Sequence, residues 1–445
     1  MDNKTIYALS TVFGKSGVAV IRISGSEVLN IIKQITDIDI KKIKSRFAYY
    51  TNIYSSDKKQ VLDKSLVLYF RAPYSFTGED ILEIQCHGSK AVLNSVFKTI
   101  SSFDNVRLAE AGEFSKRAFY NNKMDLTEAE GLADLIDAET IEQQKYAIKQ
   151  MEGNLKNLYH SWRENLLKVL SYLEAFIDFP EEDIPQNIEN DILNTVFKTR
   201  DEIKKHLSGN NVNERLKNGF RITITGAVNA GKSSLINTLT KKNTMIVSDI
   251  EGTTRDAVDI NLDIKGYPVV ITDTAGIHQT EDKIEKIGIE TALQRVKEAD
   301  IVLALYDAST GSFDNSQLPE NIGNIIYVAN KADKLDKKQI KEIENKNHCI
   351  ISAKYNTGID NLIDRITDIL KDNFSSSSSF LITRTRYREA LEDCLDNLET
   401  FSLDKEIELS AEDIRMACRA IGTITGHIKV DEILDNIFGS FCIGK

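Results

Sequence analysis

A glycine-rich segment at residues 226–233, GAVNAGKS, has the residue types and spacing best suited to chemistry. It has the form Gly-x4-Gly-Lys-Ser and stands between an apolar run, RITIT, and a helix-like run, SLINTL. In that context the backbone N–H groups of the loop and the N-terminus of the helix can hold phosphates. We expect the Lys232 ammonium to reach the β- and γ-phosphates and the Ser233 hydroxyl to bind Mg²⁺. A chance match in a loop is the weaker explanation, because both the strand and the helix are present.

Three further motifs follow in a set order and indicate which base is bound. They are GTTRD with Thr253 and Thr254, DTAG beginning at Asp273, and NKAD at residues 330–333. The Asp333 carboxylate can accept hydrogen bonds from the N1 and N2 donors of guanine, and Asn330 would add a bond at the base. Residues 352–354, SAK, would complete the base pocket through their backbone. Each motif is weak alone, but together they predict a GTP site.

Hydrolysis requires a group that orients the attacking water, and the usual position does not provide one. Ras-like GTPases carry a glutamine directly after the DTAG-type motif, whereas Ile277 stands there and cannot hydrogen-bond. Glu285 is a candidate carboxylate, although from the residues alone it is a solvated charge at the start of a helix. The residues expected to contact GTP are Asn229, Ala230, Gly231, Lys232, Ser233, Ser234, Ser248, Asp249, Ile250, Glu251, Gly252, Thr253, Thr254, Asp273, Thr274, Ala275, Gly276, Asn330, Lys331, Asp333, Ser352, Ala353 and Lys354.

The composition is that of an ordinary soluble globular protein. Of 445 residues, 41% are hydrophobic and 28% charged, and no apolar run approaches the roughly 20 residues of a membrane span. The start, MDNKTIYALS, has no leader pattern, so we expect an unprocessed cytoplasmic chain. The five cysteines form no CxxC pair, which argues against a zinc site or a disulfide framework. A net charge of −11 means that a nucleic acid must be met by a local basic patch or through a partner.

Strand-like and helix-like runs predict several domains of different class. Strand-like runs at 17–24, 65–70 and 80–86 with a helix-like run at 90–100 predict an α+β region, and residues 115–177 have helical spacing up to the prolines of DFPEEDIP. From about 220 to 373, strands alternate with helices, as in a doubly wound α/β sheet.

Five serines at residues 375–379 are expected to form a connector, and three more helical stretches follow them. We therefore predict a multidomain α+β and α/β chain in which a Ras-like P-loop domain interrupts one helical domain. The boundaries are 1–118, 119–214, 215–374 and 375–445, the second and fourth segments forming the helical domain. Loose terminal helices would give the same pattern and stay open as the alternative.

Longer strings across the chain carry a resemblance to a known family. GVAVIRISG, SFTGEDILEIQCHG, AGEFSKRAFYNNKMDLTEAEGLADLIDA, the nucleotide motifs and the C-terminal CIGK match, in order, the pattern of the MnmE (TrmE) family of tRNA wobble-uridine modification GTPases. The resemblance extends essentially from end to end. It implies an N-terminal domain for tetrahydrofolate binding and dimerisation, a discontinuous helical domain and an inserted G domain.

The resemblance also implies an activity and partners. Members of this family, with the flavoprotein MnmG, use a 5-formyl or 5,10-methylene tetrahydrofolate to install an aminomethyl or carboxymethylaminomethyl group at carbon 5 of the wobble uridine of certain tRNAs. A homodimer, a heterotetramer with MnmG, FAD bound only by that partner and transient tRNA contact are implied. Folate contacts fall on Arg22, Glu83, Lys123 and Lys445, whose charges suit a carboxylate tail and a pterin edge.

Further roles around the nucleotide follow from the same resemblance. Family members pair through their G domains and use K⁺ in place of an arginine finger. The implied K⁺ ligands are Asn229, Ser248, Ile250 (through its carbonyl) and Thr253, and Thr254 would join Ser233 on Mg²⁺. The family's water-orienting glutamate falls on Glu285. Cys442 belongs to the tail motif, but a nucleophilic role would need a lowered thiol pKa, and a lone cysteine there is most often inert.

Two other function classes share some of these features. A non-enzymatic switch GTPase acting in ribosome assembly would share residues 226–354, but it has no reason to carry Arg22, Glu83 and Lys123 with a CIGK terminus. A folate-dependent methyltransferase with a decorative G domain would not need the intact nucleotide motifs.

Overall fold

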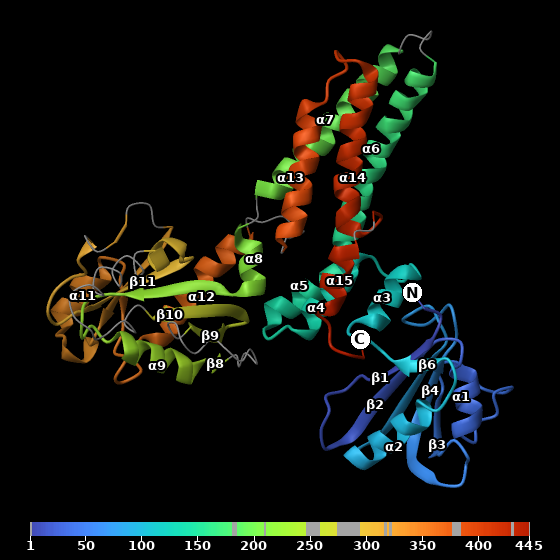
Figure 1. Ribbon diagram of the computed structural model, residues 1–445. Coiled ribbons are helices and arrows are strands. Elements are labelled where there is room, and N and C mark those ends of the chain that lie inside the picture. The colour runs from blue at the N-terminus through green and yellow to red at the C-terminus, as the bar shows by residue number, and fades with distance from the viewer. Residues whose placement is uncertain are drawn as a thin grey trace, which may run out of the picture. The chain divides into compact units, whose positions relative to one another are not determined.

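The computed structural model describes residues 2–179, 185–208, 211–245, 259–273, 294–315, 318–319, 323–375, 384–428 and 431–444 (Figure 1). The chain divides into two compact units. The first comprises residues 1–133, 156–160 and 422–445, and the second comprises residues 134–155 and 161–421. Each unit is therefore built from segments that lie far apart in the sequence.

The first unit is built on a six-stranded sheet in the order β3-β4-β5-β2-β1-β6. Neighbouring strands are antiparallel except β1 and β6, which are parallel. Helices α1 (Val28–Ile35) and α2 (Lys90–Ile100) pack on one face and bury side chains such as Ile21 and Ile84. The strands are β1 (Thr5–Leu9), β2 (Ser16–Ser24), β3 (Ala48–Tyr54), β4 (Val61–Phe70), β5 (Ile81–Gly88) and β6 (Val106–Leu108).

The opposite face of this sheet carries Arg22 and Glu83, two of the four residues expected to contact folate. Successive side chains of a strand point to opposite faces, so Arg22 lies on the face away from Ile21 and Ile23. Phe114 of α3 (Glu113–Tyr120) packs there against Ile6 and Ala8. A separate apolar cluster joins α4 (Leu126–Ile136) to α15 (Asp431–Gly439), so the C-terminal helix belongs to the N-terminal unit.

In the second unit, helices from before and after the nucleotide-binding region lie side by side (Figure 1). Trp162 donates to Glu202 (2.8 Å) between α6 and α7, and Lys204 pairs with Glu399 (2.6 Å) between α7 and α13. An ion pair between α14 and α6 adds to these contacts. The helices are α5 (Ile141–Met151), α6 (Asn154–Asp178), α7 (Gln186–Ser208), α8 (Asn211–Asn218), α13 (Thr385–Thr400) and α14 (Ile407–Thr425).

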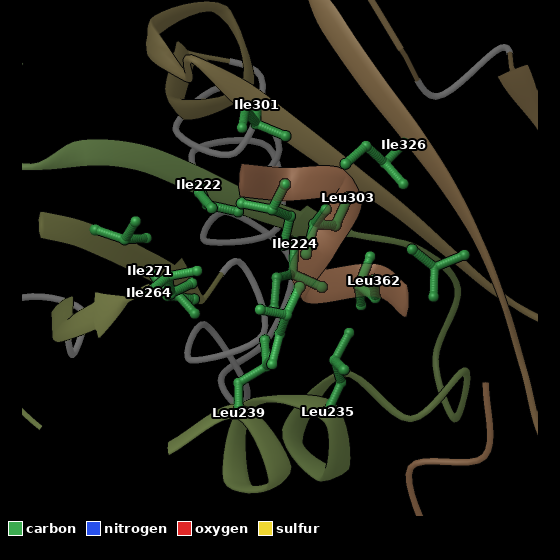
Figure 2. Packing of buried hydrophobic residues seen from close by; sticks show 14 of the residues in the cluster. Ile222, Ile224, Leu235, Leu239, Ile264, Ile271, Ile301, Leu303, Ile326 and Leu362 are labelled. Atoms are coloured by element: carbon green, nitrogen blue, oxygen red, sulfur yellow. The ribbon is translucent and has the colours of Figure 1, made fainter. Parts of the chain in front are cut away.

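A seven-stranded sheet in the order β13-β12-β11-β7-β10-β9-β8 forms the rest of the second unit. Its strands are β7 (Phe220–Thr225), β8 (Thr244–Met245), β9 (Asp259–Ile264), β10 (Tyr267–Asp273), β11 (Ile301–Asp307), β12 (Asn324–Asn330) and β13 (Cys349–Ile350). Only the pairs β10–β9 and β8–β9 are antiparallel. Figure 2 shows Leu235 and Leu239 of α9 (Lys232–Lys242) packing beneath Ile222 and Ile224 of β7. Among the described residues, helices α11 (Lys337–Glu344) and α12 (Ile359–Ser375) and the short η3 (Ala332–Lys334) also belong to this part of the unit.

One carboxylate lies where the chain enters and leaves this sheet. Asp134 Oδ1 pairs with Lys217 Nζ (3.2 Å), three residues before β7, and with an Arg384 guanidinium nitrogen (2.9 Å), at the start of α13. The Asp134 side chain is 13% exposed, while its partners Lys217 and Arg384 keep 37% and 22% of their side chains exposed. The two ends of the nucleotide-binding region are thus held at one point.

The two sheets and the many helices confirm the predicted mixture of α+β and α/β structure. Within the described ranges, no helix has the length and apolar character to cross a bilayer.

Candidate functional site

The glycine-rich loop that is expected to bind phosphates lies between a strand, β7, and a helix, α9, as predicted. β7 is the central strand of its sheet, and α9 begins at Lys232 directly after Gly231, which is left-handed at φ +100°. Asn229 is also left-handed, at φ +65°, and is exposed at the tip of the loop. Such a turn aims successive backbone N–H groups at one point in front of the helix N-terminus, which is the arrangement that binds phosphates.

Two glycines of this loop are required by their surroundings. A Cβ at Gly226, where φ is +151°, would lie 2.0 Å from the carbonyl oxygen of Leu305. A Cβ at Gly231 would lie 2.3 Å from Asn330 Nδ2. The loop is therefore packed directly against the ends of β11 and β12, and no side chain fits at either position.

The Lys232 ammonium lies over the same loop. It donates to the carbonyl oxygens of Gly226 (2.8 Å) and Ala227 (3.1 Å). Ser233 and Ser234 follow in the exposed first turn of α9. The loop, its cation and a helix N-terminus with a hydroxyl are the groups that a Mg²⁺–nucleotide requires, so the residues present fit the expected ligand.

The predicted base-binding residues meet the phosphate loop through one buried amide. Asn330 is 3% exposed; its Nδ2 donates to the carbonyl of Ala230 (2.8 Å), and its Oδ1 accepts from the backbone N–H of Ala353 (3.1 Å). Asn330 therefore ties together the 226–233 loop and the 352–354 segment, a structural role that the sequence motif does not reveal.

Asp333 presents its carboxylate at the surface beside that junction. Ser352 Oγ donates to Asp333 Oδ1 (2.5 Å), and this hydrogen bond lowers the pKa of Asp333. Ser352 itself is buried, so it fixes the orientation of an exposed acid. Lys331 pairs with Asp307 (2.7 Å), and the Lys354 ammonium lies 5.0 Å from the centre of the Tyr355 ring. An oriented, ionised carboxylate suits the paired N–H donors of guanine.

Several predicted residues lie outside the described part of the chain. They are Ser248, Asp249, Ile250, Glu251, Gly252, Thr253, Thr254, Thr274, Ala275, Gly276, Ile277, Glu285 and Lys445. Asp273 is described only as the last residue of β10, where its backbone pairs in register with Ile224 of β7. Strands β10 and β7 are parallel, so Asp273 and the start of the phosphate loop lie at the same edge of the sheet.

In the N-terminal unit, Arg22 and Glu83 form a direct cross-strand pair. They face each other in the β2–β5 register, and Arg22 Nε donates to Glu83 Oε1 (3.0 Å), with a second contact of 2.9 Å to the same oxygen. The guanidinium carbon lies 5.7 Å from the ring centre of Phe76 and 5.8 Å from that of Phe114. Both side chains keep about a fifth of their surface exposed, 22% and 18%. A ligand reaching this face thus meets a charge pair flanked by aromatic rings.

The loop before β5 connects this pair to Lys123. Lys123 is exposed, and a Cβ placed at Gly78 would come within 3.1 Å of its Cε. Phe76, two residues earlier, contacts Arg22. This loop therefore contacts Arg22 through Phe76 and lies beside Lys123 at Gly78. Among the described residues, Arg22 and Glu83 contact each other, but Lys123 makes no direct contact with either.

The C-terminal tail lies at the neighbouring strand. Ser10 Oγ donates to the carbonyl of Gly444 (3.0 Å), and Ile443 bridges to Ala111. Ser10 follows β1, whose Ala8 pairs with Arg22, so the tail lies on the strand next to the Arg22–Glu83 pair. Cys442 is exposed and its carbonyl accepts from the N–H of Gly112 (3.5 Å).

The sequence analysis did not predict a polar network that joins the end of β2, the loop before β5 and α3. Arg117, 3% exposed, donates to both carboxylate oxygens of Glu79 (3.1 and 3.0 Å) and to Glu113 (3.0 Å). Glu79 also accepts from Ser24 at the end of β2 (2.7 Å). The available signal was the cluster of charges in FTGED and AGEFSKR, which is unusual for segments that flank buried strands.

Comparisons with known proteins cover nearly the whole chain. The family model described as the MnmE helical domain matches residues 126–442, and the one described as the GTP-binding protein TrmE N-terminus matches residues 5–123. The tRNA modification GTPase MnmE of Rickettsia typhi (strain ATCC VR-144 / Wilmington) is 45% identical over 446 residues, which cover 99% of this chain and 100% of the relative. The protein of the same name from Rickettsia bellii (strain RML369-C) is 46% identical with the same coverage. Among solved structures, the G domain of the FeoB iron transporter of T. maritima matches 34% of this chain and 98% of that chain, at 22% identity and a TM-score of 0.26.

Proposed function

Because this chain belongs to the MnmE family of tRNA modification GTPases, we propose that it couples GTP hydrolysis to the modification of tRNA. In this proposal it works with a flavoprotein partner of the MnmG type, which carries the FAD. A tetrahydrofolate one-carbon unit becomes part of an aminomethyl or carboxymethylaminomethyl group at carbon 5 of the wobble uridine.

The observation that carries the proposal is the Arg22–Glu83 pair. It lies on the sheet face away from α1 and α2, between the rings of Phe76 and Phe114, and beside the strand that contacts the C-terminal tail. A folate combines a flat pterin with carboxylates, so aromatic rings, a carboxylate and a forked cation suit its parts. Lys123 and Lys445 would add cations at the edge of this site.

At the nucleotide site, each residue has a proposed task. Asn229, Ala230, Gly231, Lys232, Ser233 and Ser234 would hold the phosphates, and Asn330, Lys331, Asp333 and residues 352–354 would hold guanine. Mg²⁺, when bound by Ser233 and Thr254, would neutralise charge on the β- and γ-phosphates. The Lys232 ammonium would leave the carbonyls of Gly226 and Ala227 for the phosphates.

K⁺ and a second copy of the chain complete the proposed hydrolysis. Asn229 would bind K⁺ together with Ser248, Ile250 and Thr253, and Glu285 would orient the water. Support comes from the exposed, left-handed Asn229 at the tip of the loop, where a partner G domain could approach. We further propose a homodimer through the N-terminal domain, a heterotetramer with the flavoprotein, transient tRNA contact and a cytoplasmic location.

Calorimetry with 5-formyltetrahydrofolate tests the folate half. The wild-type chain should bind saturably, and Arg22→Ala should lose binding by about tenfold or more. Arg46→Ala is the matched control, because Arg46 also lies over an aromatic ring of the same sheet, at 5.9 Å from the centre of Phe70, but outside the proposed site. No binding by folded wild-type protein would contradict the folate assignment and favour a switch GTPase.

GTP hydrolysis in KCl and NaCl tests the other half. The wild-type rate should be higher in KCl, and Asn229→Ala should lose this difference while still binding nucleotide. Equal wild-type rates in the two salts would refute the K⁺ assignment. With GDP and aluminium fluoride in KCl, the proposal requires paired G domains, which light scattering or chemical cross-linking would detect.

A further inference from the structure

The side of the proposed folate site beside Arg22 is formed by two segments outside the sheet. One is the loop at residues 75–80, whose Phe76 ring centre lies 5.7 Å from the guanidinium carbon of Arg22. The other is α3, whose Phe114 ring centre lies 5.8 Å from the same carbon. The β2–β5 register aligns Arg22 with Glu83 but places neither ring. Other contacts must therefore hold the two rings where they are.

A buried ion pair joins these two segments. Arg117 of α3 is 3% exposed, and one of its terminal nitrogens donates to both carboxylate oxygens of Glu79 (3.1 and 3.0 Å). Its other terminal nitrogen donates to Glu113 (3.0 Å) and to the carbonyl of Lys4 (2.8 Å). The guanidinium is therefore fixed from three sides, and it fixes the loop through Glu79.

Two buried hydroxyl groups attach the same loop to the strand that carries Arg22. Ser24 Oγ donates to Glu79 Oε2 (2.7 Å) and lies 2.7 Å from Thr77 Oγ1, which accepts from the backbone N–H of Glu79 (3.2 Å). Ser24 and Thr77 are fully buried. Ser24 follows Arg22 by two residues in β2, so both lie on the same face of the sheet. Asn121 at the end of α3 donates to the Thr77 carbonyl (2.6 Å) and closes the network.

The loop also sets the place of a second residue expected to contact folate. A Cβ at Gly78, where φ is +81°, would lie 3.0 Å from Asn121 Cβ and 3.1 Å from Lys123 Cε. Phe76 and Gly78 are two residues apart in one loop. The position of this loop therefore determines both the ring beside Arg22 and the packing around Lys123.

We propose that Arg117 and Glu79 are positioning residues of the folate site, which act through Phe76. Their ion pair holds the ring beside the Arg22 guanidinium, so that the cation is ready to meet a flat, carboxylate-bearing ligand. A buried ion pair gains little net stability over well-packed apolar side chains, but it can select one geometry. The inference rests on the proposed folate binding and adds two residues that are not expected to contact the ligand.

Two other roles for the pair make different predictions. Glu79 keeps 29% of its side chain exposed, so it could instead contact the ligand directly. A purely structural role would make every break in the network equivalent. Glu113 provides the matched control for that case, because it pairs with the same arginine and is 5% exposed, but it makes no contact with the loop among the described interactions.

Calorimetry with 5-formyltetrahydrofolate on the full chain compares the two carboxylates. Glu79→Gln should lower folate affinity about tenfold, since a charged hydrogen bond that holds the loop is lost. Glu113→Gln should stay within about twofold of wild type, and both variants should bind GTP normally. An equal loss of folate affinity in the two variants would overturn the proposal. Asn121→Ala releases the loop from an exposed position that folding tolerates, and it should cost about threefold.

A double-mutant cycle separates positioning from direct contact. If Glu79 acts through Phe76, the effect of Glu79→Gln on folate affinity should shrink to about twofold or less in a Phe76→Leu background. If the full loss of affinity persists there, Glu79 contacts the ligand itself and is not a positioning residue.

A fluorinated phenylalanine incorporated only at residue 76 tests the same inference without folate. Its fluorine NMR resonance should shift or broaden in Glu79→Gln and stay unchanged in Glu113→Gln. An unchanged resonance in Glu79→Gln would overturn the proposal. Failure of the wild-type chain to bind folate would instead contradict the proposed function, so the two failures are distinguishable.

Discussion

At the proposed nucleotide site, the groups expected to bind phosphates lie within one segment of eight residues, and two glycines allow that segment to pack against the sheet. On the N-terminal sheet, Arg22 and Glu83 are 61 residues apart and meet only because β2 pairs with β5 in one register. The first site depends on the backbone conformation of a short segment. The second depends on strand pairing and on side chains, so equally small substitutions should act differently at the two sites.

Because the nucleotide site depends on its backbone conformation, we expect the largest loss of affinity from a substitution at Gly226. Gly226→Ala would place a Cβ 2.0 Å from the Leu305 carbonyl oxygen at a φ of +151°. Strain and overpacking should together reduce nucleotide affinity by about a thousandfold. Fluorescent GDP titration would measure it.

Gly323→Ala is the control for that measurement, because no atom lies within 4 Å of a Cβ there. Its affinity should equal that of wild type. Tight binding by Gly226→Ala would show that the loop can move away from β11, and the contrast between the two sites would disappear.

In the N-terminal unit, we expect the charge of a side chain, rather than the backbone conformation, to decide how a substitution acts. Asp125 is an example. Burial raises the pKa of Asp125 from 3.8 to about 6, so the folded state holds its proton more tightly than the unfolded state does. The resulting loss in the free energy of unfolding is absent below about pH 4, grows between about pH 4 and 6, and reaches its full size above about pH 6. Asp125→Asn should therefore raise the free energy of unfolding at pH 7 by up to about 3 kcal/mol.

Urea unfolding at pH 4 and pH 7 would measure that gain. The difference between variant and wild type should be much smaller at pH 4, and Asp57→Asn should show no comparable gain at pH 7. A gain that is equal at both pH values would mean that the charge of Asp125 is not its cause.

Arg22→Lys tests whether the geometry of the cross-strand pair matters beyond its charge. A lysine keeps the cation but cannot make the two nitrogen contacts to Glu83 or lie as a plane between Phe76 and Phe114. We expect folate affinity to fall about tenfold with GTP binding unchanged. Calorimetry with folate and with GTP would measure both affinities. If Arg22→Lys bound folate as tightly as wild type, only the charge of residue 22 would matter for binding.

Ser352→Ala should have the smallest effect. Its hydroxyl orients the exposed Asp333 carboxylate and lowers the pKa of that group. The carboxylate stays ionised at neutral pH without it, so only orientation is lost, and GTP affinity should fall about threefold to tenfold. Ser55→Ala removes a similar bond to Asp57 (2.6 Å) in the other unit and should leave GTP affinity unchanged. A loss beyond a hundredfold would mean that Ser352 contacts the nucleotide itself.

The same contrast explains what the sequence could and could not predict. The phosphate loop, the helix at residues 90–100 and most strands were predicted because their signals lie in neighbouring residues. The edge strand β6 and the helix α1 were not singled out, since three residues or one apolar run carry little periodic signal. The pairing of Arg22 with Glu83 became visible only with the strand register.

Long-range contacts were beyond sequence reasoning for a physical reason. The NKAD motif predicts that Asn330 lies near the base, but it does not predict that the buried amide joins Ala230 to Ala353. Asp125 and Thr425 look like a helix cap and a helix end. Only the fold brings these two residues to the lining of one cavity.

The position of Asp134 bears on how such a chain could be assembled from parts. Because Lys217 and Arg384 both reach this one carboxylate, the 166 residues between them behave as a closed loop in the polymer sense. The entropic cost of closing a loop grows only with the logarithm of its length. The helical bundle therefore forms at almost the same free-energy cost whether the inserted segment is short or long. A nucleotide-binding module could thus have been acquired, enlarged or exchanged at this point without any redesign of the bundle.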